Sequence, residues 1–329
     1  MILSDALSIQ AAQAADLWGG APDLRPIVNR ENAVLSGTFP FGQAALRLHR
    51  AGYQGQVAIR SELWLCAGLA AAGQPVPRAI AARDGHLVQD AGAGRHASVI
   101  AWVEGRPMGA AGVPFAGNRL SQVTMMRDLG AMLAGMHAAC DLLELPGWFS
   151  RHRWDVDGIT GEAPFWNRFW EHPALTADEA ALLTRTRAWL ADRLQAHAAA
   201  GGDFGLIHAD VLRENVLMVR GDDGRDHPHL IDFDDCGWGF RAFDLGTVLS
   251  QCLDEPHLPH LARALSDGYG AHRPFDRDMV PVMTLARCCT SVGWTMTRLD
   301  PGHPVHRSHI ARCTGLARQM LDGGADWWG

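Results

Sequence analysis

The sequence predicts an α+β fold in which a small strand-rich region precedes a larger, mostly helical region. Short apolar segments separated by polar turns fill the N-terminal part, whereas from residue 121 onward apolar residues recur every three or four positions. The 329 residues, 47% of them apolar, can bury a substantial core and form two lobes. We place the boundary at the hinge-like Glu104-Gly-Arg-Pro107, so the lobes span residues 1–103 and 104–329.

Helices and strands of the first region follow from composition and spacing. Alanine-rich residues 4–18 predict a helix that Gly19-Gly20 ends. Residues 59–72 place Leu63, Cys66 and Leu69 on one face and predict a second helix. Apolar segments predict strands at residues 24–28, 33–36, 44–49 and 97–103.

The second region combines helices with one hairpin. The apolar stripe from Val123 to Cys140 predicts a long helix, and Thr176 with Glu179 forms a capping box at the start of another over residues 176–200. Strands are predicted at residues 206–207, 215–219 and 229–233, the last two joined by a polar turn. Further helices are predicted at residues 243–254, 258–269, 277–298 and 305–321.

Composition excludes several classes of function. With a net charge of −7 and no basic run, nucleic acid is not an expected partner. No apolar run reaches the length of a membrane span and the N-terminus lacks a secretory pattern, so we expect a cytoplasmic protein without a membrane partner. Seven cysteines without a C-x-x-C pair indicate reduced core residues. Nothing in the sequence indicates an oligomeric state.

Three oxygen-bearing side chains cluster around the predicted hairpin. Asn215 and Asp232 are expected at adjacent strand ends, and Asp210 lies in the preceding loop. A hydroxyl nucleophile needs a carboxylate to accept its proton, and the Mg²⁺ that bridges the phosphates of ATP needs oxygen ligands of the Asn and Asp type. The spacing therefore predicts phosphoryl transfer.

The same residues resemble those of a known family. His208-x-Asp210-x-x-x-x-Asn215 followed by Ile231-Asp-Phe-Asp234 is similar to the catalytic loop and metal aspartate of the aminoglycoside phosphotransferase and choline kinase family. The same motifs are also similar to those of type II homoserine kinases and bacterial stress-response kinases. The resemblance implies a bilobal, protein-kinase-like fold, Asp210 as the catalytic base, and Asn215 and Asp232 as Mg²⁺ ligands, with Asp234 for a second metal.

Supporting residues are also implied by the resemblance. Asp244 in Arg241-Ala-Phe-Asp-Leu-Gly matches an aspartate that braces the catalytic loop through hydrogen bonds, and we read His208 as a second, buried brace. The segment Leu129-Gly-x-x-Leu-Ala-x-Met-His137 resembles the helix that precedes the catalytic region.

The nucleotide-binding residues depart from the family pattern. Every one of the 29 basic residues is arginine, so the lysine that kinases direct at the phosphates is absent. We expect Arg47 to replace it, held by Glu62, because an arginine fork also binds phosphate oxygens.

The turn at residues 29–32 lacks the glycine that lets backbone amides approach phosphates, which leaves Asn32 and Arg30 as candidate phosphate contacts. The alternative is that this segment is a plain hairpin turn. By the resemblance, adenine lies beside Trp102 and Val103.

The acceptor cannot be chosen from the sequence. Clustered carboxylates would suit an aminoglycoside, an aromatic cage choline, and an arginine the carboxylate of an amino acid. The candidates for these roles are Asp254, Glu255, Trp166, Trp170, Trp294, Arg287 and Arg298, of which we single out Arg287, Arg298 and Trp294. We do not expect a metal at His303, His306 and His309.

The function predicted is an ATP- and Mg²⁺-dependent phosphotransferase acting on a hydroxyl of a small molecule: an amino alcohol, an amino acid or an aminoglycoside-like compound. The alternatives are a Ser/Thr protein kinase of the same fold and a catalytically weak, pseudokinase-like nucleotide-binding module.

Overall fold

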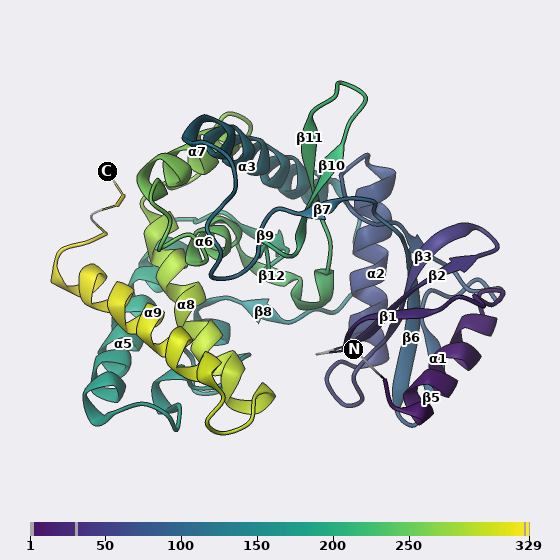
Figure 1. The fold of residues 1–329 in the computed structure, drawn as a ribbon. Helices are drawn as coiled ribbons and strands as arrows, with labels where there is room; N and C mark the ends of the chain where they lie inside the picture. The colour runs from purple at the N-terminus through teal and green to yellow at the C-terminus, as the bar shows by residue number, and fades with distance from the viewer. Residues whose placement is uncertain (1–2, 30–31, 326, 329) are drawn as a thin grey trace. The chain divides into compact units, whose positions relative to one another are not determined.

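The computed structural model describes residues 3–29, 32–325 and 327–328 and divides into two compact units (Figure 1). Unit 1 comprises Met1–Arg106, Leu142–Arg151 and His229–Asp234. Unit 2 comprises Pro107–Asp141, His152–Pro228 and Asp235–Gly329. Two short segments from the later part of the chain thus belong with the N-terminal unit, which the sequence did not indicate.

Unit 1 is built on an antiparallel sheet of order β1-β2-β3-β6-β4, with β5 also paired to β6. The strands are β1 (Arg25–Asn29), β2 (Ala33–Phe39), β3 (Gly42–Leu48), β4 (Ala79–Ile80), β5 (Gln89–Gly92) and β6 (Arg95–Ala101). In the central strand β3, Arg47 pairs with Val34 on one side and Ser98 on the other. Arg47 is therefore anchored by strands on both sides.

Two helices pack against this sheet. Helix α1 (Asp5–Asp16) begins at the N-cap Ser4, and its alanines join a core with Leu35 and Leu46. Helix α2 (Gln56–Ala71) buries Ile59 and Leu63 in a separate cluster. Glu62 is also buried in α2.

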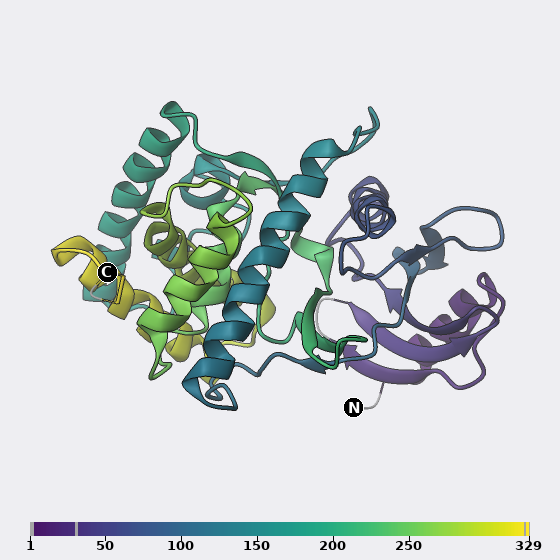
Figure 2. The same cartoon turned by 90° about the horizontal axis from the view of Figure 1, so that it is seen from above.

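Unit 2 is mostly helical. Its helices are α3 (Arg119–Leu142), α4 (Val156–Thr160), α5 (Ala177–Ala199), α6 (Ala242–Ser250), α7 (Leu258–Gly270), α8 (Met279–Arg298) and α9 (Pro304–Asp322). Helix α8 contacts α6 and α9, and α9 also contacts α5 (Figure 1). Helix α3 runs beside α6 and α7 (Figure 2), and His137 of α3 bonds to both of those helices.

Short strands complete the fold. The strands β8 (Arg153–Trp154), β12 (Gly237–Phe240) and β9 (Phe204–Ile207) form one sheet in that order. A second sheet has the order β11-β10-β7, from β11 (Asp226–Leu230), β10 (Val216–Arg220) and β7 (Arg106–Pro107). The predicted hairpin is confirmed as β10 and β11.

The predicted α+β fold class is confirmed, but some element boundaries were wrong. The strand predicted over residues 229–233 ends at Leu230, because Asp232 has a left-handed φ of 66° and a 3₁₀ turn, Phe233–Asp235, follows. Asn215, predicted to begin a strand, precedes β10, and helix α6 ends at Ser250 instead of at residue 254. The glycine-rich β12 was missed because glycine disfavours strands in isolation.

The structure also shows the state of the cysteines and the apolarity of the helices. All seven cysteines are buried thiols, which confirms them as core residues. Among the residues that the structure describes, no helix combines the length and apolarity needed to cross a bilayer.

Candidate active site

A single carboxylate holds the loop that follows β9. The Oδ2 atom of Asp244 accepts the N–H of His208 at 2.9 Å, and its Oδ1 atom accepts the N–H of Ala209 at 2.7 Å. Ala209 has a φ of 67°, a conformation that a residue with a Cβ rarely adopts. The two hydrogen bonds from buried amides offset that strain and set the path of the chain into Asp210.

Asp244 is itself held by helix α3. His137 Nε2 lies 3.0 Å from Asp244 Oδ2, and His137 Nδ1 lies 2.9 Å from the Tyr269 hydroxyl. Burial lowers the pKa of His137, so the ring is neutral and donates from Nε2. Burial would raise the pKa of Asp244, but the hydrogen bonds from the His137 ring and the His208 main-chain amide outweigh it and hold that pKa below its ordinary value.

The carboxylate of Asp210 is bound on both oxygens. Asn215 Nδ2 donates to Oδ2 at 2.8 Å and Arg287 Nη2 donates to Oδ1 at 2.7 Å. The same Nδ2 also bonds to the main-chain oxygen of Asp210, while His208 Nδ1 accepts the N–H of Asp210 at 3.2 Å. These bonds do not use the side-chain oxygen of Asn215, which is a suitable ligand for a hard cation.

The contact between Arg287 and Asp210 has no signal in the sequence, since 77 residues separate the two. Arg287 lies on α8, and its guanidinium carbon is 4.8 Å from the centre of the Trp166 ring. The guanidinium of Arg298 lies 5.9 Å from the same ring and 5.5 Å from that of Trp294. Arg287 and Arg298 therefore both lie near the Trp166 ring, Arg298 also lies near Trp294, and Arg287 contacts Asp210.

A buried ion pair occupies the centre of unit 1. Arg47 Nη1 lies 2.5 Å from Glu62 Oε1, and Arg47 Nη2 lies 3.2 Å from Asp234 Oδ1. Burial opposes the charge on Arg47, but Glu62 and Asp234 outweigh it and raise the pKa of the guanidinium. The strand-to-helix pair expected from the sequence is thus formed, with a second carboxylate added.

Asp234, for which the sequence resemblance implies a second metal, lies in a buried and charged environment. Burial and the neighbouring Glu62 raise the pKa of Asp234 to about 6, although Arg47 and Arg151 oppose this. The main-chain oxygen of Asp234 accepts from Gln54 and Arg151, each at 2.5 Å. Asp232 lies at the start of the same turn and contributes to the field at Arg47.

The remaining nucleotide candidates that the structure describes lie at two places in unit 1. Asn32 is buried, accepts the N–H of Arg50 at 3.1 Å and bonds to Asp234. Trp102 is 38% exposed and donates to Glu104 at 3.0 Å, and Val103 beside it is half-buried. Arg30 lies outside the described residues.

The other acceptor candidates are accounted for within unit 2. Glu255 is buried and pairs with Arg213 at 2.7 Å, whereas Asp254 is exposed. Trp170 belongs to the core. His306 bonds to His172 and Thr295, and no group of three or more metal-ligating side chains occurs in the described part of the chain.

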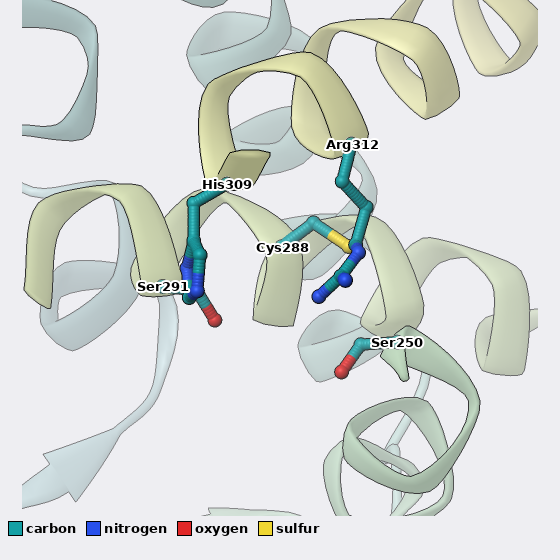
Figure 3. Close-up of a pocket in the computed structure, with 5 residues that line it drawn as sticks. All are labelled: Ser250, Cys288, Ser291, His309 and Arg312. Carbon is teal, nitrogen blue, oxygen red and sulfur yellow. The ribbon is translucent and has the colours of Figure 1, made fainter. Parts of the chain in front are cut away.

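A small polar cavity lies between α8, α9 and the end of α6 (Figure 3). It is lined by Ser250, Cys288, Ser291, His309 and Arg312. Its volume of about 10 Å³ suits one water molecule and no larger ligand. Ser291 also accepts a hydrogen bond from Arg287 Nη1 at 2.6 Å, so the cavity lies behind the residue that contacts Asp210.

The catalytic-loop motif lies within a family match that covers most of the chain. Residues 23–279 match the sequence profile of the phosphotransferase enzyme family. The chain belongs to this family. The resemblance read from the motifs is confirmed, and the chain is a phosphotransferase, a kinase with an alcohol group as acceptor.

Solved structures of several small-molecule kinases have a similar fold. A microcompartment-associated aminopropanol kinase is 27% identical, with a TM-score of 0.82 over 97% of this chain and 98% of its own. An amicoumacin kinase in complex with AMP-PNP and Ca²⁺ is 18% identical, with a TM-score of 0.75 over 97% and 94%. A choline kinase from Streptococcus pneumoniae is 14% identical, with a TM-score of 0.63 over 96% and 99%. No significant match was found among curated proteins.

Proposed function

We propose that this phosphotransferase moves the γ-phosphoryl group of ATP, in the presence of Mg²⁺, to the hydroxyl of a small molecule. Family membership supports the reaction type. The nucleotide is supported by the ATP analogue named with the amicoumacin kinase. The small-molecule acceptor is supported by relatives named for aminopropanol, amicoumacin and choline.

The observation that carries the proposal is the setting of Asp210. Its carboxylate is oriented by Asn215 and Arg287, and 16% of the side chain remains exposed. A carboxylate fixed by neighbours and still accessible can accept the proton of an incoming hydroxyl. Asp210 is then the catalytic base, while Asp244 and His208 support its loop.

The metal assignment rests on the chemistry of the donors and on the order of the motifs. Asn215 supplies an amide oxygen and Asp232 a carboxylate, both of the hard type that Mg²⁺ prefers, and Asp234 is the candidate for a second ion. Mg²⁺ when bound neutralises charge on the phosphate oxygens. We assign Asn215 and Asp232 to hold it.

On the nucleotide side, Arg47 takes the place of the missing lysine, and Glu62 keeps its guanidinium in one orientation. Asn32, Trp102 and Val103 complete the proposed nucleotide contacts.

The test compares wild type with Asp210→Asn. We expect the variant to retain Mg-ATP binding in a calorimetric titration but to lose about 10²- to 10⁴-fold in acceptor-stimulated ADP release, because the proton acceptor is gone. Asp192→Asn, an exposed change on α5, is the matched control and should behave as wild type.

Acceptors for the assay are amino alcohols, hydroxy amino acids and aminoglycosides. Equal rates for wild type and Asp210→Asn with every acceptor would contradict the base assignment. If both rates stay at the background level, the pseudokinase-like alternative is favoured.

A further inference from the structure

We infer that Arg287 selects an acceptor that carries a carboxylate beside its hydroxyl, such as a hydroxy acid or hydroxy amino acid. The inference rests on the proposed function, since it concerns the acceptor that Asp210 would deprotonate. Every residue that carries it lies in unit 2.

Arg287 is a buried charge with incomplete pairing. The residue is 4% exposed. Its Nη2 bonds to Asp210, its Nη1 bonds to the uncharged Ser291, and its Nε is buried without a hydrogen-bond partner. Buried guanidinium groups normally satisfy all of their N–H donors, so this arginine has unused capacity for an anion.

Proton transfer to Asp210 would also remove the negative charge that compensates Arg287. When Asp210 accepts the proton of the hydroxyl, its carboxylate becomes neutral, and the carboxylate that compensates Arg287 is lost. A guanidinium stays protonated at all relevant pH, so the buried charge would be left uncompensated during the reaction. A carboxylate on the acceptor would replace the lost charge at that step.

The surroundings of Arg287 disfavour an acceptor whose only charge is an ammonium group. Arg298 approaches the same Trp166 ring, so two cations flank that indole. The buried acidic candidate, Glu255, is engaged by Arg213 at 2.7 Å. A planar carboxylate matches a guanidinium fork, whereas an isolated ammonium is repelled by it.

The experiment uses acceptor pairs that differ only in the carboxylate: threonine with 1-amino-2-propanol, and serine with ethanolamine. We expect wild type to use the carboxylate member of at least one pair with a kcat/KM at least tenfold higher. In Arg287→Gln that preference should fall roughly tenfold to hundredfold, as for loss of a hydrogen bond between charged groups. Arg185→Gln, which removes an exposed charge on α5, is the matched control and should keep the preference.

The outcomes separate this inference from the proposed function. Phosphorylation of both members with equal efficiency by wild type, or an equal loss on both in Arg287→Gln, overturns the carboxylate assignment and leaves the phosphotransferase intact.

Because a variant can lose turnover through misfolding, acceptor binding to wild type is also titrated calorimetrically with AMP-PNP and Mg²⁺ present. Tighter binding of the carboxylate members supports the inference even if no phosphate is transferred. The absence of phosphate transfer would contradict the proposed function but not the inference. Tighter binding of the amines refutes the inference.

Discussion

Replacing Asp244 by alanine tests whether one side chain holds the catalytic loop. The carboxylate accepts three hydrogen bonds, from the amides of His208 and Ala209 and from the ring of His137. Hydrogen bonds to a charged group contribute about 1.5–3 kcal/mol each, and the alanine variant leaves buried donors unpaired. We expect the free energy of unfolding to fall by about 3–5 kcal/mol, since three buried donors lose their acceptor at about 1–3 kcal/mol each and local relaxation recovers part of the loss.

Urea denaturation at pH 7 measures this loss, and amide hydrogen exchange of the peptide containing residues 208–209 localises it. The matched control, Asp192→Ala on the exposed face of α5, should change stability by less than about 0.5 kcal/mol. Since the pKa of Asp244 is depressed in the folded state, its contribution is present above the ordinary value of 3.8 and is lost as the pH falls through the folded value. A loss below about 1 kcal/mol with unchanged exchange at residues 208–209 would refute this account of the loop.

Two other predictions concern stability. Burial, with the charges of Arg312 and Arg287, lowers the pKa of His309 to about 4, so the unfolded chain takes up a proton there before the folded one does as the pH falls below 6.5. Stability should therefore drop by roughly 2–3 kcal/mol between pH 6.5 and pH 4 from this group, and His309→Gln should flatten that part of the urea-midpoint profile; an unchanged profile would contradict the assignment. A Cβ at Gly130 of α3 would lie 2.0 Å from the main-chain oxygen of Leu265, so Gly130→Ala should destabilise by about 1–3 kcal/mol or more. Gly315→Ala, in α9 with no atom within 4 Å of the new methyl group, should instead stabilise the protein by about 0.5–1 kcal/mol. A loss of stability in both variants, or in neither, would contradict the close contact of Gly130 with Leu265.

The sequence was most informative where local physics governs. The capping box of Thr176 and Glu179 formed as predicted, because its bonds join residues three apart. The apolar stripe of α3 likewise appears as a helix over Arg119–Leu142. Boundaries failed where one residue departs from its neighbours, as at Asp232, whose left-handed conformation ends an otherwise extended segment.

The reaction type was readable from the chain alone, because the motifs around one hairpin resemble those of the phosphotransferase family to which the chain belongs. The roles proposed for Asp210, Asn215 and Asp232 rest on the same motifs. The pairing of Arg287 with Asp210, the second carboxylate on Arg47 and the support of Asp244 by His137 and Tyr269 were decided by the tertiary structure. These contacts join residues far apart along the chain, and their strength comes from burial. Spacing along a sequence reports neither which distant side chains meet nor how much water surrounds them, so the environment of Asp210 emerged only from the fold.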